Sequence, residues 1–321
     1  GSGDNYIYIA IRRPDGAVGE LPTTGTQVFT PVYDSSGVPL FKTPNHYVDM
    51  SLQKNSNWAT SGASWNVVNR LRSKERLEPQ DTHAEAYNSL HTFDFQYGES
   101  QYSGSGGNER FSWNWKRYSG FDMLYYTGNG SSPRNINHSL NNIPEMIVCK
   151  KVDGNANWQT YHVGIGNTKY VYWNQNYPAQ TSSAVWANTT PTESVFTIGS
   201  GAEVNENGYL YLALLFSSVD GISKLGSYTG TSSAQTITTG FSPRFLLIKQ
   251  VSGNTGGTNR DWNVYDTVRG ISSGNDKRLI LNTTAAQNDG NYVDVSSTGF
   301  EVNSVNDVGA NGNVYIYYAH A

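Results

Sequence analysis

Short runs of alternating apolar and polar residues recur along the chain and predict β-strands rather than helices. The run WNVYD at 262–266 alternates, whereas FLLIK at 245–249 is continuously apolar, as in a strand buried on both faces. Asn-Gly and Asp-Gly pairs, such as that at 207–208, separate these runs and are typical of hairpin turns. Only 67–76 has a spacing that suits a helix, and Pro79 ends it, so we expect a loop or a short helix there. The pattern predicts an all-β fold.

The same motifs occur three times in the same order, with a period of roughly a hundred residues. The last two copies both open on Tyr-Thr-Gly, at 126–128 and 228–230, and both close on a Tyr-rich run, at 209–215 and 315–320. A proline and a tryptophan recur in all three copies: Pro44, Pro144 and Pro243, and Trp65, Trp158 and Trp262. We expect the three recurring tryptophans to be core anchors of three similar units.

These anchors predict three tandem β-sandwich-like units, the first of which diverges from the other two. We place the units at residues 17–118, 119–219 and 220–321. Residues 1–16 contain the run NYIYIAI, which is similar to the closing run of a unit. Two interpretations stay open. The segment closes a preceding unit of a longer array, or it returns to complete a sheet out of sequence order.

The closing run at 315–317 predicts which face its tyrosines occupy. Alternation places Tyr315 and Tyr317 on one face of the strand and Ile316 on the other. We expect Ile316 to face the core and the tyrosine row to lie half-buried against a neighbouring strand or unit. A ligand-binding row of tyrosines is the alternative.

Composition narrows the class of protein further. Charged residues make up 15% of the chain, the formal net charge is −4 and no long basic block occurs, which argues against nucleic acid as a partner. The single cysteine, Cys149, excludes a disulfide framework within one chain. No apolar stretch approaches the roughly 18 residues that a membrane span needs, and no signal peptide is visible. The sequence therefore predicts no membrane insertion.

The sequence contains no convincing catalytic or metal-binding pattern. The six histidines form no metal-binding motif, although His83 and His91 lie close together in the first copy. Asp94, Glu99 and Glu109 are carboxylates of that copy, but nothing in the sequence brings them to one cleft. We therefore predict no catalytic residue, no metal ligand and no cofactor.

One aromatic segment stands outside the repeat pattern. The run YVYWNQNY at 170–177 combines aromatic and amide side chains, as sugar-binding surfaces do, and another tryptophan follows shortly. Packing or subunit contact is the alternative role for these side chains. The candidate ligand-binding residues are Tyr170, Tyr172, Trp173, Tyr177 and Trp186.

The last two copies resemble an uncharacterised β-rich repeat domain of tail-fibre-like and virion proteins of tailed bacteriophages, especially marine ones. The residues that carry the resemblance are YTGTSSAQTI at 228–237, GFSPRFLLIK at 240–249, DWNVYDTVRG at 261–270, STGFEV at 297–302 and GNVYIYYAHA at 312–321, with weaker counterparts in the second copy. The resemblance implies a β-sandwich-like unit in a virion surface protein that attaches to the host. The family has no known catalytic residues that could be assigned to positions of this sequence. Such a protein is synthesised in the host cytoplasm and displayed on the virion surface.

The expected partners follow from that resemblance. They are a host cell-surface glycan or receptor, other virion proteins and further copies of the same chain, most simply in a homotrimer that gains avidity. A monomer in which the first strand returns to its own chain is the alternative. A glycan depolymerase and a purely structural capsid or fibre decoration protein are the alternative functions.

Overall fold

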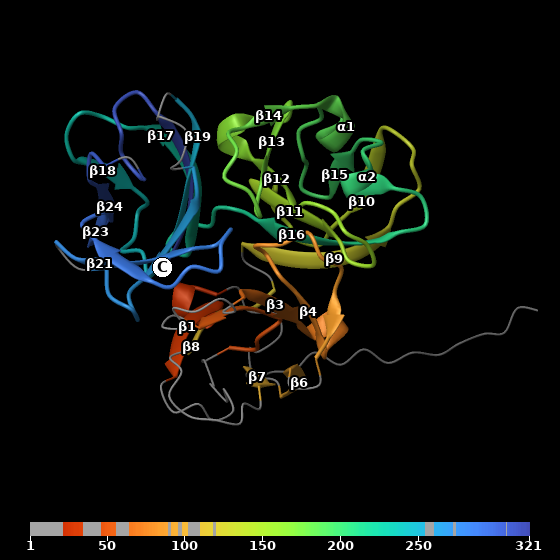
Figure 1. Ribbon diagram of the computed structural model, residues 1–321, viewed down its shortest axis with the longest axis horizontal. Coiled ribbons are helices and arrows are strands. Elements are labelled where there is room, and N and C mark those ends of the chain that lie inside the picture. The colour runs from red at the N-terminus through yellow and green to blue at the C-terminus, as the bar shows by residue number, and fades with distance from the viewer. Residues whose placement is uncertain are drawn as a thin grey trace, which may run out of the picture.

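The computed structural model describes residues 22–34, 46–55, 64–88, 91–95, 98–101, 110–117, 120–253, 260–271, 274–305 and 307–321. The run at 5–11, Pro44 and Glu109 lie outside these residues. The chain forms three β-rich units that surround a common centre (Figure 1). None of the described helices is long and apolar enough to cross a membrane.

Each unit contains a six-stranded sheet and a smaller second layer. The first unit consists of η1 (Gly25–Gln27), β1 (Phe29–Asp34), β2 (Met50–Asn55), β3 (Asn66–Asn69), η2 (Arg70–Arg72), β4 (Glu75–Leu77), β5 (Ala86–Tyr87), β6 (His91–Phe95), β7 (Gly98–Gln101) and β8 (Arg110–Trp115). The second consists of β9 (Phe121–Thr127), β10 (Arg134–Asn137), β11 (Met146–Lys151), β12 (Gln159–His162), η3 (Val163–Ile165), β13 (Lys169–Tyr172), β14 (Gln180–Thr181), α1 (Ser183–Trp186), β15 (Val195–Ile198), α2 (Ala202–Asn205) and β16 (Leu210–Phe216). The third consists of β17 (Ser223–Thr229), β18 (Gln235–Thr238), β19 (Phe245–Ser252), β20 (Trp262–Asp266), β21 (Asp276–Ile280), β22 (Asn288–Gly290), β23 (Val293–Ser296), β24 (Gly299–Val302) and β25 (Val314–His320).

The three large sheets share one topology. In each, the first strand of the unit pairs with the last strand, which pairs in turn with the second long strand, and the remaining strands follow in sequence. The orders are β1-β8-β2-β3-β4-β5, β9-β16-β11-β12-β13-β14 and β17-β25-β19-β20-β21-β22, and the strand pairs are antiparallel. The expectation of an all-β fold with three tandem sandwich-like units is confirmed.

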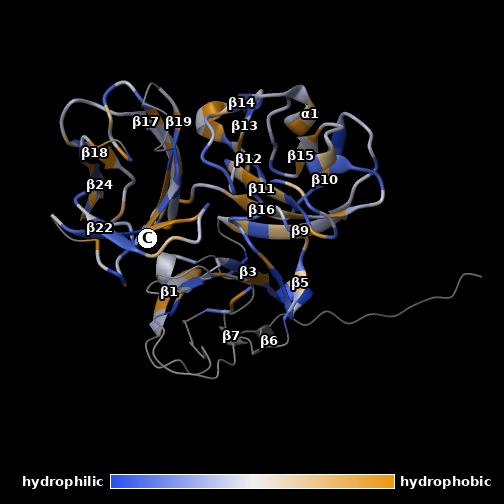
Figure 2. Cartoon of the chain, in the orientation of Figure 1, coloured by the Kyte–Doolittle hydropathy of each residue, from blue (hydrophilic) through white to orange (hydrophobic). Residues whose placement is uncertain are grey.

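The outer face of each large sheet packs on its own second layer. That layer is the β6-β7 hairpin in the first unit, β10-β15 with α1 and α2 in the second, and β18-β24-β23 in the third. The clusters of buried side chains between the layers are separate in the second and third units. Hydrophobic residues lie mainly along the strands and hydrophilic residues mainly in the loops (Figure 2).

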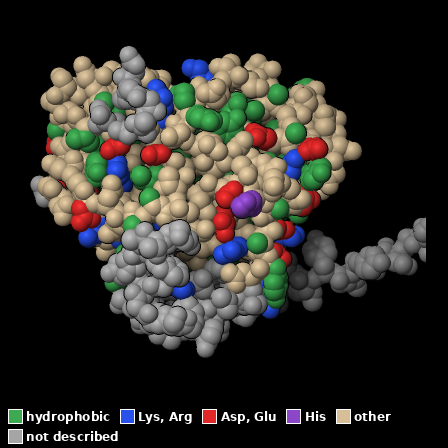
Figure 3. Space-filling view, viewed as in Figure 1, with side chains coloured by type: hydrophobic (Ala, Val, Ile, Leu, Met, Phe, Trp, Pro, Cys, Tyr) green, Lys and Arg blue, Asp and Glu red, His purple; other side chains and the backbone are tan. Residues whose placement is uncertain are grey.

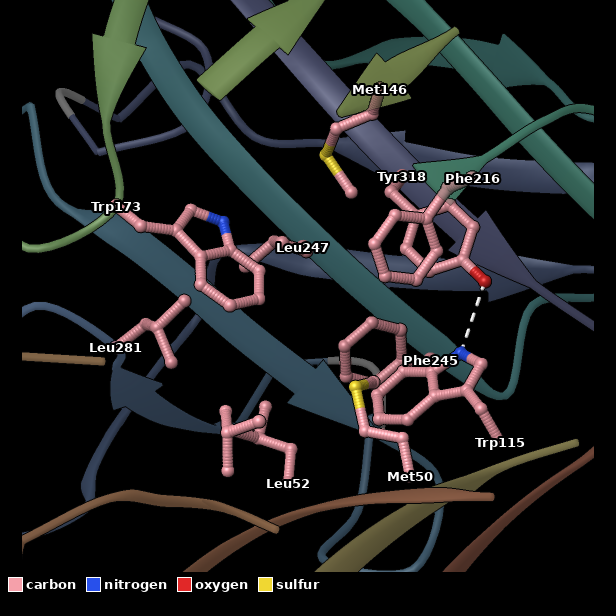
Figure 4. Close-up of a pocket in the computed structure, with 11 residues that line it drawn as sticks. Met50, Leu52, Trp115, Met146, Trp173, Phe216, Phe245, Leu247, Leu281 and Tyr318 are labelled. Carbon is pink, nitrogen blue, oxygen red and sulfur yellow. Dashed lines mark hydrogen bonds between the residues drawn. The ribbon is translucent and has the colours of Figure 1, made fainter. Parts of the chain in front are cut away.

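The inner faces of the three sheets form one shared core. It contains, among others, Leu52 of the first unit, Leu214 of the second and Leu247 of the third, all at most 4% exposed. At its centre the first residues of β2, β11 and β19, which are Met50, Met146 and Phe245, border an apolar cavity of about 10 Å³ (Figure 4). A cavity this small and apolar suits at most one water molecule. The centre is therefore closely packed.

The recurring tryptophans join the units in a closed ring. Each indole Nε1–H donates to a carbonyl of a neighbouring unit. The acceptors are Ile280 and Thr283 for Trp65 at 2.9 and 3.1 Å, Asp81 for Trp158 at 3.1 Å, and Tyr172 for Trp262 at 2.7 Å. The prediction that these tryptophans are core anchors is confirmed, because none is more than 1% exposed.

A second set of contacts closes the ring in the opposite direction. The last residues of β3, β12 and β20, which are Asn69, His162 and Asp266, each accept a backbone N–H from the following turn and reach into the next unit. Asn69 Nδ2 donates to Tyr125 Oη at 3.0 Å, His162 Nε2 donates to the Tyr317 carbonyl at 3.1 Å, and Asp266 Oδ2 accepts from Trp113 Nε1 at 3.1 Å. Three chemically different side chains thus perform one structural role.

Two local expectations need correction. Val67 and Val68 belong to β3, and only Arg70–Arg72 form a short 3-10 helix, because both valines pair across strands and are buried. Tyr315 and Tyr317 do share a face opposite Ile316, but they are 0% and 5% exposed rather than half-buried. Both faces of β25 are covered, one by the second layer of its unit and the other by the neighbouring units.

Candidate functional site

The five candidate ligand-binding residues do not stay together. Trp173 is 3% exposed and packs in the shared core, and Trp186 is 2% exposed and packs edge-on against Tyr161 in the core of the second unit. Neither indole presents a face to solvent. The remaining three form what we call the tyrosine patch: Tyr177 is exposed, whereas Tyr170 and Tyr172 are partly buried and Tyr170 packs against the core of the second unit.

The tyrosine patch is a compact aromatic surface at the edge of the second sheet. The Tyr170 and Tyr172 hydroxyls are 3.2 Å apart, and their rings meet edge to face with centroids 5.2 Å apart. Tyr177 is 54% exposed, and its ring lies edge-on to Tyr172 at 6.2 Å. Hydrophobic side chains gather over β13 and β14 on the face shown in Figure 3. The patch offers ring faces and hydroxyls to a ligand.

A chain of polar side chains runs beside the patch. Asn174 Nδ2 donates to Asn157 Oδ1 at 2.8 Å, and Asn157 Nδ2 donates to Glu203 Oε1 of α2 at 2.8 Å. Burial raises the pKa of Tyr172, and its hydrogen bond to Tyr170 and the Glu203 carboxylate raise it further. Tyr172 therefore remains a neutral phenol near neutral pH, and the Glu203 carboxylate, which Asn157 holds, acts on it electrostatically.

The patch is held in place by the ring. The Asn174 Oδ1 atom accepts the Trp158 backbone N–H at 3.1 Å, and the Tyr172 carbonyl accepts the Trp262 indole. Further along, the Ala179 N–H donates to the Val251 carbonyl of the third unit at 2.9 Å. The segment that carries the patch is thus fixed at both ends, which lowers the cost of ordering it around a ligand.

The equivalent loop of the first unit carries different chemistry. Glu78, Asp81 and His83 bring carboxylate and imidazole ligand atoms within 4.8 Å of one another. Their contacts are local, however: His83 Nδ1 lies 3.3 Å from Asp81 Oδ2, and Glu78 binds Arg76 and Gln80. Figure 3 shows a histidine beside acidic side chains on this face. Ion pairing accounts for these side chains, so we assign no metal site to them.

Three of the other carboxylates and histidines considered above belong to the first unit. Asp94, Glu99 and His91 lie in the β6-β7 hairpin, and their side chains are outside the described residues.

Sequence reasoning missed Glu203 and Asn157. Neither belongs to the aromatic run, and Glu203 lies in α2, far along the chain. The separation of Trp173 from the tyrosines did have a signal. Val171 and Trp173 share one side of the strand pattern, while Tyr170 and Tyr172 share the other. The apolar Val171 marks the side that packs in the core.

A comparison with curated proteins finds no match. A family model described as a domain of unknown function (DUF7483) matches residues 48–321 as one stretch. The matched stretch includes strands of all three units, so the family unit corresponds to the ring rather than to one sandwich. The chain therefore belongs to the DUF7483 family.

Proposed function

We propose that this chain is a virion-surface protein of a tailed bacteriophage and attaches the particle to a glycan on the host surface. The resemblance of the repeated motifs at 228–237, 261–270 and 312–321 to phage tail-fibre-like proteins supports the virion assignment. The observation that supports glycan binding is the tyrosine patch together with the amides and the carboxylate that lie near it.

The chemistry of the patch suits a sugar. The C–H faces of a pyranose ring stack on exposed aromatic rings such as Tyr177, and sugar hydroxyls exchange hydrogen bonds with amide, phenol and carboxylate groups. Asn157, Tyr172 and Glu203 supply those groups within one small area. A site fixed by the ring loses little entropy on binding, so modest contacts suffice for adhesion by many copies.

Binding to immobilised host surface polysaccharide tests this proposal. We expect Tyr177→Ala to weaken binding at least tenfold, because it removes the most exposed ring of the patch. Tyr87→Ala is the matched control, since Tyr87 is 67% exposed but lies in the first unit. Equal binding by both variants and the parent would refute the patch as the site. Release of reducing ends from the polysaccharide would show that the protein cleaves the glycan, and the proposed function would then be depolymerisation rather than adhesion.

Location and assembly are tested separately. A labelled antibody against the chain should decorate intact particles in electron micrographs. We also propose that the chain self-associates as a homotrimer, which light scattering measures as three times the 35.3 kDa chain mass. Decoration of particles together with no affinity for any host glycan would favour a purely structural role.

A further inference from the structure

Tyr170 occupies a position that holds an arginine in both sister units. The two strands flanking the loop pair with the same spacing in all three units: Arg76 faces Ala86, Tyr170 faces Gln180 and Arg278 faces Asn288. The loops are therefore of equal length, and Arg76, Tyr170 and Arg278 are structurally equivalent.

In the sister units this arginine is a built-in cation. Arg76 donates to Asn66 Oδ1 at 3.3 Å and pairs with Glu78 at 3.2 Å. Arg278 donates to Asn263 Oδ1 at 3.4 Å, pairs with Asp307 at 2.7 Å and lies 4.4 Å from the centre of the Tyr292 ring. In each case a guanidinium joins an amide oxygen on the neighbouring strand to a carboxylate.

The second unit keeps the partners of this cation but not the cation. Gln159 takes the place of Asn66 and Asn263, since it also follows the recurring tryptophan directly. It pairs with Tyr172, is 1% exposed, and its Oε1 atom has no hydrogen-bond partner in the described part of the chain. Its strand partner Tyr172 has the Tyr170 ring edge-on to its own ring, and burial together with the Glu203 carboxylate raises the pKa of Tyr172.

Neighbouring lysines do not fill this role. Lys169 precedes Tyr170 and so lies on the opposite face of β13. Burial lowers the pKa of Lys150 and the Glu203 carboxylate partly offsets this shift, but the Lys150 ammonium already donates hydrogen bonds to the Thr82 and Ala156 carbonyls at 2.9 and 3.0 Å. Among the described residues Glu203 forms no ion pair.

We propose that the tyrosine patch selects a glycan that carries a positively charged amino group, a proposal that rests on the glycan-binding function above. The ammonium lies against the Tyr172 and Tyr177 rings, where a cation is attracted to the π-electrons, and within reach of the Glu203 carboxylate. The sugar ring then stacks on the exposed face of Tyr177. The ligand supplies the positive charge that Arg76 and Arg278 supply in the other two units.

Two oligosaccharides that differ in charge alone test this inference. Glucosamine oligomers carry free amines, and N-acetylglucosamine oligomers of the same length are neutral. We expect calorimetric titration at pH 6 to show at least tenfold tighter binding of the amine form. Glu203→Gln should abolish that preference, whereas Glu193→Gln should leave it unchanged, because Glu193 is an exposed carboxylate before β15 with no described contact to the patch.

The outcomes separate the two proposals. Equal affinity for both oligomers would overturn charge selection and leave glycan binding standing. Binding of neither oligomer, or of any host polysaccharide, would overturn both. Binding of an arginine-rich peptide but of no amino sugar would overturn the glycan assignment, because the cation would then come from a protein partner.

Discussion

The hydrogen bond from the Trp262 indole to the Tyr172 carbonyl should contribute measurably to the stability of the ring. Trp262→Phe keeps an aromatic ring in place but removes the N–H donor, which is 2.7 Å from its acceptor. Trp186→Phe is the matched comparison. Its indole is equally buried, at 2% exposed, but has no hydrogen-bond partner in the described part of the chain.

The expected magnitudes differ between the two variants. Both lose a similar apolar area, which costs about 2 kcal/mol in free energy of unfolding. Trp262→Phe also leaves the Tyr172 carbonyl without its cross-unit donor, which adds about 1–3 kcal/mol. Trp186→Phe removes a buried N–H donor that has no partner in the described part of the chain, which offsets about 1 kcal/mol of the loss in free energy of unfolding. The difference between the variants should be at least about 2 kcal/mol.

Urea unfolding followed by far-ultraviolet circular dichroism measures this difference without using tryptophan fluorescence. Trp158→Phe should behave like Trp262→Phe, because its indole also donates to a neighbouring unit. Equal destabilisation by Trp262→Phe and Trp186→Phe would refute the reasoning, since the cross-unit hydrogen bonds would then contribute nothing net.

Two further predictions concern the residues that close the ring in the other direction. Burial lowers the pKa of His162 from 6.5 to about 4. The unfolded chain therefore binds a proton at a higher pH than the folded chain does, and the free energy of unfolding decreases as pH falls from 6.5 towards 4. His162→Asn should therefore reduce the loss of unfolding free energy between pH 7 and pH 5 by about 2 kcal/mol, and an identical loss in both proteins would contradict this. Asp266→Asn removes the carboxylate that pairs with the fully buried Arg269 at 2.5 Å and should cost about 3–5 kcal/mol. In calorimetry, the double variant with Arg269→Met should melt above Asp266→Asn alone; a lower melting temperature would show that the arginine is not left unpaired.

The sequence predicted the class of fold because its evidence was local. Alternation and Asn-Gly turns identify strands, and the period of the tryptophans identifies three units. The shared core was not predictable in this way. A strand such as 245–252 is apolar on both faces, and nothing in its sequence says whether the second face meets its own unit or a neighbour.

The ring contacts of Asn69, His162 and Asp266 escaped prediction for a different reason. An amide, an imidazole and a carboxylate share no pattern, although each accepts a turn N–H and bridges to the next unit. The tyrosines of the candidate site were predicted from their local run, but Glu203 approaches them only through the fold of α2.

The closed ring has a consequence for the order in which the chain acquires its structure. Trp65 bonds to the carbonyls of Ile280 and Thr283, more than two hundred positions later in sequence. While the chain emerges from the ribosome, the second unit covers only part of the inner face of the first sheet, and the rest has no covering until the third unit has been made. Contacts of such long range slow folding and leave apolar surface exposed in the meantime. Biogenesis of this protein should therefore depend on chaperones that shield the first two units until residues 245–283 arrive.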